Sequence, residues 1–344
     1  MPTREQLRPN PGSNPGAVPG RAPRIVSLVP SATEILCAIG GRELLVGRSH
    51  ECDHPSYLDG VPVVTGQTTR GSSPAEIDRQ VREQLATGAS LYTLDGGLVE
   101  SLRPDVILTQ DLCAVCSIDL AAVQGMVARW ERPPRIVSLN PTSIEDVLDD
   151  VLKVGRAAGL AAEASRFAVE LRGRFFSAQE HVNPYGDGPR VVFLEWTDPL
   201  FVGGHWIAQM VERAGAGHPL NQTSAAEGSG AAAGPQQSWR RAGKSITVSS
   251  EQVVAVDPQA VVICPCGVGL AQAQHMAEEL ANQAWFSGLR AARSGRVAVV
   301  DGNQMFSRPG PRLADAMAWL VGWLHGLPGL IPEGFPWAER PPAR

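Results

Sequence analysis

The sequence contains neither a long apolar segment nor a concentration of positive charge. Its apolar runs, such as residues 297–300, are far shorter than the roughly 20 residues that a helix needs to cross a bilayer. Lys and Arg number 30 against 35 Asp and Glu, which gives a net charge of −5. No Lys/Arg run is interleaved with aromatic residues. We therefore expect neither membrane insertion nor a nucleic-acid partner.

The sequence also lacks the common catalytic motifs. It contains no GxSxG, no GxxxxGK[ST], no HExxH, and no GxGxxG after a strand. Ser49 and His50 are adjacent, but neighbouring residues on a strand point to opposite faces, so they do not form a nucleophile and base on that geometry. We expect a protein that is not an enzyme and that has no cofactor of its own.

The N-terminal stretch lacks the apolar core of a secretory signal. Residues 1–23 are rich in Pro and Gly, which predicts a disordered arm. Six cysteines lie in a chain that is too long to need disulfide staples, which favours reduced thiols in the cytosol. If a leader has been removed, the expected compartment is the periplasm instead.

The organisation of the chain is that of an α/β protein. A length of 344 residues fits two domains, and β-branched apolar runs alternate with amphipathic helical stretches, the pattern of buried, mostly parallel sheets. The predicted strands are 24–29, 44–47, 105–109, 135–139, 190–194, 260–264 and 296–300. The predicted helices are 31–39, 74–87, 118–129, 204–214, 269–283 and 312–325.

Two further features divide these units between two Rossmann-like lobes. Residues 142–182 contain no Pro and carry apolar residues at helical spacing, which predicts a linking helix, either single or in two nearly continuous parts. RIVSLVPSATE at 24–34 is partly repeated as RIVSLNPTSIE at 135–145. We expect an N-terminal lobe over 24–141, a C-terminal lobe over 189–327 with a flexible insertion at 222–244, and a tail over 328–344.

Several ordered segments resemble the class III solute-binding proteins of ABC importers. They are RIVSLVPSATEILCAIGG (24–41), LVGRSHECDHP (45–55), LRPDVILTQ (102–110), EWTDPLFVGGHWIAQMVERAG (195–215), SSEQVVAVDPQAVVI (249–263) and FSRPGPRL (306–313). The sequence is similar in particular to the iron-siderophore and cobalamin binding domain, and more to its cobalamin branch. The resemblance covers roughly residues 24–325.

The resemblance implies two α/β lobes joined by a rigid helix, with cobalamin or a related metal chelate held in a cleft between them. It also implies export and docking to an ABC permease through one exposed Glu in each lobe. Glu251 matches the second of these positions, whereas Gly97 stands at the first, with Asp95 and Glu100 nearby. A stand-alone carrier of the chelate is the alternative to a permease-coupled role.

The loop SHECDHP supplies the first group of candidate ligand-binding residues. In an extended segment His50, Cys52 and His54 share a face. His50 is a candidate axial donor to the metal of a bound chelate through its neutral imidazole, and Glu51, Cys52 and Asp53 are candidate contacts. The alternative is a polar turn that ends at Pro55, with Cys52 packed inward.

Cysteines at the ends of strands are the second group. Cys113 and Cys116 follow one predicted strand, and Cys266 follows another at the edge where ligands bind in open parallel sheets. Together with His50 and Cys52 these thiols also allow a rival interpretation, a cytosolic zinc- or thiol-dependent enzyme. The alternative is a structural role, in which the thiols pack in the layer of side chains at the strand ends.

The remaining candidates lie near helix starts and in aromatic segments. We expect aromatic rings to cover the face of a macrocycle, and an Arg to make forked hydrogen bonds to the edge of a ligand. For Ser31 a helix cap is the alternative to a ligand contact, and for Arg308 it is an anchor for the last helix. These candidates are Ser31, Thr33, Trp196, Phe201, His205, Trp206, Phe306 and Arg308.

Overall fold

The computed structural model describes residues 21–68, 74–87, 90–111, 118, 120–183, 186, 188–227 and 240–342. The chain divides into two compact units. Unit 1 comprises the described residues up to Thr68, together with those in Ser90–Asn140 and in Asp149–Ala168. Unit 2 comprises the described residues of Thr69–Ala89, Pro141–Leu148 and Val169–Arg344. The predicted α/β class is confirmed in each unit.

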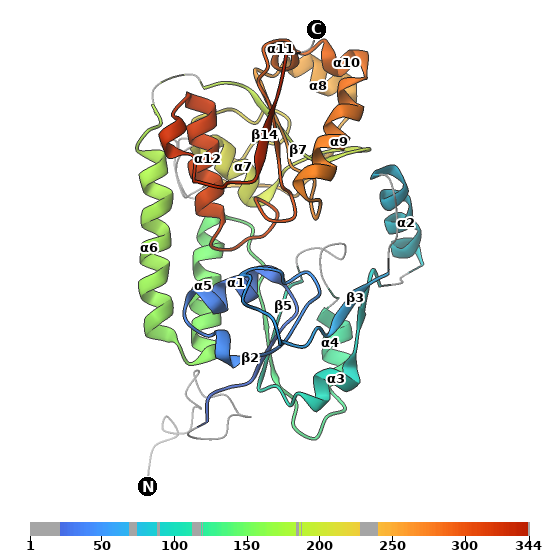
Figure 1. Cartoon of the computed structure of the whole chain (residues 1–344), viewed down its shortest axis with the longest axis vertical. Helices are drawn as coiled ribbons and strands as arrows, with labels where there is room; N and C mark the ends of the chain where they lie inside the picture. The colour runs from blue at the N-terminus through green and yellow to red at the C-terminus, as the bar shows by residue number, and fades with distance from the viewer. Residues whose placement is uncertain are drawn as a thin grey trace. The chain divides into compact units, whose positions relative to one another are not determined.

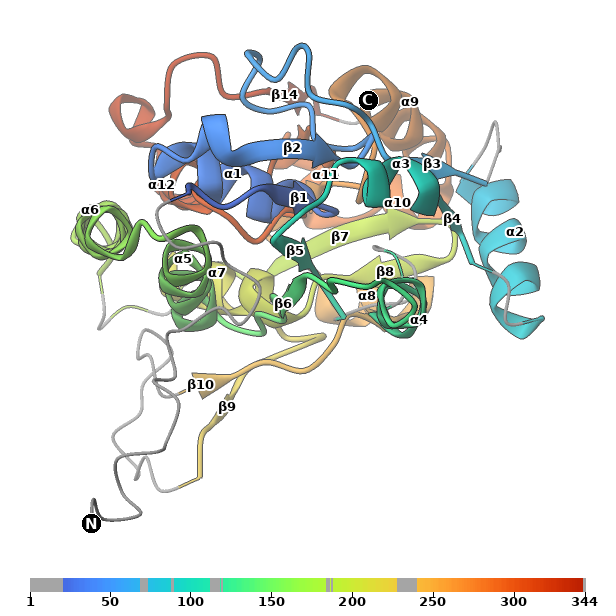
Figure 2. The same ribbon diagram turned by 90° about the horizontal axis from the view of Figure 1, so that it is seen from below.

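Unit 1 is built on a four-stranded parallel sheet. Its strands follow the order β2 (Leu45–Arg48), β1 (Ile25–Ser27), β5 (Val106–Thr109) and β6 (Arg135–Ser138), which can be followed in Figure 2. The unit also contains the helices α1 (Pro30–Ala38), α3 (Gly96–Ser101) and α4 (Leu120–Val127) and a 3-10 turn, η2, at Arg42–Leu44. The strands β1 and β5 are wholly buried, as their continuous apolar runs predict.

A second, smaller sheet in unit 1 was not predicted. The strands β3 (Thr65–Gln67) and β4 (Tyr92–Leu94) pair antiparallel, with Thr65 opposite Leu94 and Gln67 opposite Tyr92. Each strand has only three residues and neither is fully buried. Hydrophobic periodicity does not detect such short strands because they provide too few residues to show a repeat.

Unit 2 contains a six-stranded sheet of mixed direction. Its order is β11 (Ile246–Thr247), β8 (Leu200–Val202), β7 (Val191–Thr197), β12 (Ala260–Ile263), β13 (Val297–Val300) and β14 (Trp337–Arg340). The central strands β7, β12 and β13 pair parallel, whereas β8, β11 and β14 join the sheet through antiparallel pairs, so the predicted parallel arrangement holds at the centre of the sheet and not at its edges. The β7–β8 connection is too short for a parallel crossover, which forces a hairpin.

The remaining elements of unit 2 are helices and a separate strand pair. The helices that follow β8 in the described residues are α7 (His205–Arg213), α8 (Ser250–Val256), α9 (Leu270–Ala281), α10 (Ala284–Ser287), α11 (Arg290–Arg293) and α12 (Leu313–His325). The unit also holds α2 (Pro74–Ala86), a 3-10 turn η3 (Pro328–Leu330), and the pair β9 (Ser224–Ala225) and β10 (Arg240–Arg241). Figure 2 shows β9 and β10 set apart from the strands of the main sheet.

The segment 142–182, predicted as a linking helix, forms two separate helices, α5 (Ile144–Ala158) and α6 (Ala161–Gln179). A single helix is therefore wrong, and the two parts are not continuous but lie side by side (Figure 1). Gly159 ends α5 with φ +74°, the left-handed conformation that glycine adopts readily after a helix. A Cβ on Gly155 would clash with the side chain of Ala164, so small residues permit the close approach of the two helices.

The insertion predicted as flexible over 222–244 has described ends that are firmly held. Thr223 is buried and donates its backbone N–H to Glu212 Oε1 at 2.8 Å and its hydroxyl to Glu212 Oε2. Arg240 donates from Nε to Thr223 Oγ1 at 2.6 Å and from Nη2 to the Thr223 carbonyl at 2.6 Å. The charged network fixes both ends of the insertion to α7. Its central residues, 228–239, lie outside the described residues.

The segment predicted as a tail, 328–344, completes the core of unit 2. Its strand β14 pairs with β13, and Phe335 stacks on the fully buried ring of Trp319 at a centroid distance of 5.2 Å. Trp319 also stacks on Trp323 at 5.6 Å and meets Trp337 edge to face at 5.5 Å. The tail prediction is wrong because these aromatic residues bury a large apolar area only against partners distant in sequence.

Candidate ligand-binding site

The loop that follows β2 lies at the carboxyl edge of the unit 1 sheet, where open α/β sheets bind ligands. Its base is closed by two backbone bonds, from Arg48 N–H to the Pro62 carbonyl and from Val64 N–H to the Arg48 carbonyl, both at 2.9 Å. Arg48 Nη1 also donates to the carbonyl of Cys52 at 2.7 Å. The loop is therefore held at its base and at its middle.

His50 is fixed in this loop by the first residue of β3. Its backbone N–H donates to Thr65 Oγ1 at 2.9 Å, and its ring Nδ1 lies 2.7 Å from the same oxygen. The ring of Tyr92 from β4 packs against the imidazole at a centroid distance of 5.9 Å. The small β3–β4 sheet thus determines the position of the imidazole of His50.

The other ring nitrogen of His50, Nε2, is buried and has no hydrogen-bond partner among the described residues. Burial lowers the pKa of His50 below its usual value of 6.5, so the ring is neutral at pH 7. A neutral imidazole with one nitrogen hydrogen-bonded and the other unpaired is the form in which histidine binds metals.

Glu51 and Asp53, the other predicted contacts of this loop, differ in exposure. Glu51 is half-buried and accepts a hydrogen bond from the hydroxyl of Tyr92 at 3.4 Å, whereas Asp53 is exposed. The structure brings Glu51 and His50 together against the ring of Tyr92. A ligand contact by either acid stays a prediction.

Cys52 does not share an open face with His50. Its side chain is fully buried, and Thr33 donates its hydroxyl to the Cys52 sulfur at 3.0 Å. Thr33 is itself fully buried and lies 2.8 Å from the hydroxyl of Ser27. These groups link α1, β1 and the loop internally, which favours the alternative of Cys52 packed inward, and ligand contacts through Cys52 and Thr33 stay predictions.

Ser31 is buried in the first turn of α1, but it is not a helix cap. The helix begins at Pro30, and Val29 occupies the cap position without a side-chain hydrogen bond. Proline at the first position needs no acceptor for a backbone N–H, which allows the helix to begin without a polar cap.

At the carboxyl edge of the unit 2 sheet, Trp196 and Phe201 are only partly buried. The indole N–H of Trp196 donates to the Asp198 carbonyl at 3.0 Å, and Trp196 packs against the core beneath it. Phe201 lies opposite Trp196 in the β7–β8 hairpin. Both rings retain accessible surface at this edge, and their contact with a ligand stays a prediction.

Trp206 and Phe306 are buried in the core of unit 2, which favours a structural role, and their contact with a ligand stays a prediction. The indole N–H of Trp206 donates to the Phe306 carbonyl at 2.7 Å in a buried position. The ring of Phe306 meets Phe193 at 4.9 Å and Trp319 at 5.8 Å. The pattern of rings near a strand end did not separate a pocket wall from this core because both require large apolar side chains.

His205 and Arg308 lie at the borders of that core. His205 is half-buried with φ +50°, its ring stacks on Trp206, and burial together with the positive charge of Lys244 lowers its pKa. Arg308 is buried and donates from Nη2 to Asn303 Oδ1 at 3.1 Å, which ties together the loop before α12. This arrangement favours the anchoring alternative for Arg308.

The thiols are mostly unsuited to bind a ligand or a metal. Burial raises the pKa of Cys37 to about 11 and holds that of Cys264 well above its usual value, so both remain protonated thiols. Cys266 is exposed. Cys113 and Cys116 lie outside the described residues. Among the residues that are described, no three His, Cys, Asp or Glu side chains form a metal-binding group.

Two residues of the His50 site, Thr65 and Tyr92, were missed by sequence reasoning. They lie 15 and 42 positions after His50 in chain order and reach it only because β3 and β4 pair. The one local signal is the short run VVTGQT around Thr65, which has strand-forming residues but no clear alternation. A pairing of two such short strands is not readable from the sequence.

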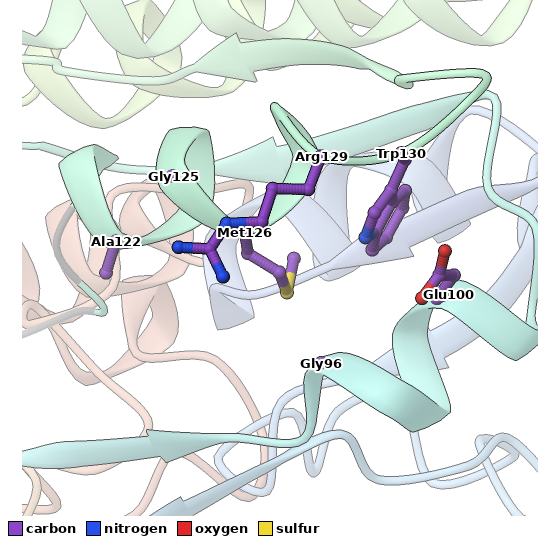
Figure 3. Close-up of a pocket in the computed structure, with 7 residues that line it drawn as sticks. All are labelled: Gly96, Glu100, Ala122, Gly125, Met126, Arg129 and Trp130. Atoms are coloured by element: carbon purple, nitrogen blue, oxygen red, sulfur yellow. The ribbon is translucent and has the colours of Figure 1, made fainter.

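Two pockets lie elsewhere and contain none of the predicted site residues. One, of about 510 Å³, is lined by Gly96 and Glu100 of α3 and by α4 with the turn after it, including Met126, Arg129 and Trp130 (Figure 3). The other, of about 430 Å³, lies between α6 and α12 and includes the ion pair of Arg174 with Asp315 at 2.6 Å. We place the candidate site at His50 because its Nε2 is buried without a partner among the described residues, whereas the histidine of the second pocket, His181, is exposed.

Comparison with known proteins identifies the family. The family described as periplasmic binding protein matches residues 25–303. The chain belongs to this family. A cobalamin-binding protein of Halobacterium salinarum is 25% identical over 305 residues, which is 88% of this chain and 69% of the relative. As a periplasmic binding protein the chain is a binding protein and not an enzyme.

Solved structures of periplasmic binding proteins share the fold. A periplasmic heme binding protein from Pseudomonas aeruginosa superposes with a TM-score of 0.64 at 21% identity, covering 94% of this chain and all (100%) of the other. The periplasmic vitamin B12 binding protein of Vibrio cholerae gives 0.60 at 18% identity, covering 89% and 98%. A periplasmic heme-binding protein from Roseiflexus gives 0.63 at 19% identity, covering 89% and 99%.

In the described part of this periplasmic binding protein, no helix has both the length and the apolar character to cross a membrane.

Proposed function

We propose that the protein binds a metal chelate of the cobalamin or haem class without transforming it. The observation that carries the proposal is His50, a neutral imidazole whose Nε2 is unpaired and whose Nδ1 is hydrogen-bonded. The relatives named for binding cobalamin (vitamin B12) or haem support the class of ligand, because both compounds hold a metal in a macrocycle. The metal of such a ligand has axial positions that an imidazole can occupy where no other donor holds them.

In this proposal His50 donates Nε2 to the metal of the cargo. Glu51 and Asp53 offer carboxylates from the same loop for polar groups at the ligand edge, and Trp196, Phe201, His205 and Cys266 remain candidate contacts from unit 2. A ligand site shared by both units, as the resemblance implies, stays a prediction. The protein supplies no cofactor of its own.

The rival interpretation as a zinc- or thiol-dependent enzyme has no support. Of the residues it required, Cys52 is buried against Thr33, and family membership gives a binding protein. Metal analysis of the purified protein provides a direct check. One tightly held zinc per chain, without corrinoid or haem binding, would restore the rival.

The decisive experiment titrates the purified protein with cobalamin, with cobinamide, which lacks the lower nucleotide base, with haemin, and with a ferric siderophore. Visible spectra report ligation and calorimetry reports affinity. We expect cobinamide or haemin to show an imidazole-ligated spectrum that His50→Ala abolishes. His54→Ala is the matched control because His54 lies in the same loop and is exposed. Absence of binding to all four compounds would refute the proposed function.

We also propose that Glu251 docks the protein to an ABC permease. Glu251 is exposed in the first turn of α8, where hydrogen bonds from Ser249 and from its own backbone lower its pKa and keep the carboxylate charged. Gly97 occupies the same position, second in the helix, in α3 after the cap Asp95. Unit 1 thus presents Asp95 and Glu100 in place of a Glu at that position.

Charge reversal tests this docking role. Glu251→Arg should reduce uptake of labelled cobalamin in cells that depend on this protein, without changing its affinity for cobalamin in solution. Glu279→Arg, on the exposed side of α9, is the control. Normal uptake with Glu251→Arg would favour the stand-alone carrier. The compartment, periplasmic if a leader has been removed and otherwise cytosolic, also stays a prediction, which cell fractionation tests.

A further inference from the structure

The hydroxyl of Thr65 is the meeting point of three polar groups in unit 1. Its Oγ1 accepts the backbone N–H of His50 at 2.9 Å, lies 2.7 Å from His50 Nδ1, and lies 3.0 Å from Ser49 Oγ. Ser49 Oγ accepts in turn the backbone N–H of Glu51 at 3.3 Å. Ser49 is almost fully buried, so bulk water does not compete freely for this bond.

The hydrogen-bonding capacity of a hydroxyl group restricts how these contacts are filled. A hydroxyl has one proton and two acceptor sites, and the backbone N–H of His50 already occupies one acceptor site on Thr65. Two arrangements remain. Either Thr65 accepts a proton from His50 Nδ1 and donates its own to Ser49, or it donates to Nδ1 and accepts from Ser49.

These two arrangements correspond to the two tautomers of neutral His50. In the first, Nδ1 carries the proton and Nε2 has a free lone pair. In the second, Nε2 carries the proton and presents no lone pair to a metal. Burial lowers the pKa of His50, so the doubly protonated ring is a minor form at pH 7.

We propose that Thr65 and Ser49 form a proton-ordering pair that sets the tautomer of His50 for metal ligation, a role that rests on the proposed function. A metal at Nε2 is compatible only with the first arrangement. In that arrangement both acceptor sites of Thr65 are filled, so its proton must point to Ser49. Thr65 and Ser49 are therefore positioning residues that act through His50.

The ring of Tyr92 completes the arrangement. It packs against the imidazole at a centroid distance of 5.9 Å with an interplanar angle of 50°, which limits rotation of the ring about its bond to Cβ. In this proposal the hydrogen bonds of Thr65 and Ser49 fix the tautomer of His50, and packing against Tyr92 fixes the plane of the imidazole ring. Tyr92→Phe keeps the ring and removes the hydroxyl, which donates to Glu51, so we expect it to retain ligation.

The experiment uses the full chain loaded with Co(II) cobinamide. Electron paramagnetic resonance of low-spin Co(II) shows splitting by an axial nitrogen, which reports imidazole ligation directly. Thr65→Val keeps the shape and removes the hydroxyl, Thr65→Ser restores a hydroxyl, and Ser49→Ala removes the final acceptor. Thr93→Val, an exposed position on the paired strand β4, is the matched control.

We expect nitrogen splitting in the wild type, in Thr65→Ser and in Thr93→Val. Thr65→Val should lose the splitting or bind cobinamide about 10- to 100-fold more weakly, the usual effect of removing a partner that orients a metal ligand. Ser49→Ala should also weaken the nitrogen splitting and the affinity for cobinamide, as Thr65→Val does. Splitting and affinity that are unchanged in Thr65→Val, or a wild type that binds cobinamide without nitrogen splitting, would overturn the proton-ordering role.

A measurement without ligand separates failure of this inference from failure of the proposed function. Nitrogen-15 chemical shifts of the His50 ring report its tautomer in the free protein. If the wild type binds neither cobinamide nor haemin, the proposed function fails. The proton-ordering pair then stands only if Thr65→Val changes the tautomer ratio of His50 and Thr65→Ser restores it. Unfolding curves for each variant exclude global loss of structure as the cause.

Discussion

Acidification should destabilise unit 2 through a single buried histidine. His218 is almost fully buried, its Nδ1 lies 3.1 Å from the Asn221 carbonyl oxygen, and its Nε2 has no hydrogen-bond partner. Burial lowers the pKa of His218 from 6.5 to about 4. In the unfolded chain this ring binds a proton below pH 6.5, whereas in the folded protein it stays neutral until about pH 4.

The sign and size of the effect follow from this difference. The unfolded state binds more protons throughout the window from pH 6.5 to about pH 4, so the free energy of unfolding falls as the pH falls. Each pKa unit corresponds to about 1.4 kcal/mol. The loss from His218 should therefore reach about 3 kcal/mol at pH 4 and become nearly constant below it.

Urea unfolding at several pH values, from roughly 7.5 to 4, measures the free energy of unfolding of the wild type and of His218→Gln, whose side chain cannot take up a proton. The difference in slope between the two proteins isolates His218 from the carboxylates that titrate in the same range. His275→Gln is the control, because His275 is exposed on α9. Parallel pH profiles for the wild type and His218→Gln would refute the reasoning.

Three further changes test other parts of the structure. Chelate binding should weaken as the pH falls through the lowered pKa of His50, since a protonated imidazole cannot ligate a metal, and His50→Ala should remove this dependence in visible titrations. Trp319→Ala should lower the free energy of unfolding by about 3–5 kcal/mol in urea, because it empties the centre of the aromatic cluster; a loss below about 1 kcal/mol would contradict that packing. Thr223→Val should cost about 1.5–3 kcal/mol, the usual contribution of hydrogen bonds to charged groups, and should loosen the β9–β10 pair in hydrogen exchange. Unchanged exchange there would show that the backbone bond to Glu212 suffices.

The sequence by itself determined the central strands and the long helices. Continuous apolar runs at 105–109 and 260–264 are the buried strands β5 and β12, within a residue at either end. The helices predicted at 74–87 and 312–325 are α2 and α12. These elements are readable because their burial imposes a repeat or a run of apolar residues on the chain itself.

The sequence also identified His50, but for a reason that proved only partly correct. Alternate placement of His50 and Cys52 suggested a shared face, whereas the loop turns at Ser49 and buries Cys52 against Thr33. Spacing along an extended strand does not apply once the chain leaves the sheet. The chemistry of a residue type was informative, and the assumed direction of its side chain was not.

Only the tertiary structure decided which side chains surround the candidate site and which fill the core. Thr65 and Tyr92 reach His50 through the pairing of two strands of three residues each. Trp206 and Phe306 meet in the core although 100 residues separate them in the chain, and the indole of Trp206 donates there to the Phe306 carbonyl. Contacts of this kind depend on where distant segments meet, and no local repeat in the sequence records that, because the free energy that selects them comes from burial in the assembled fold.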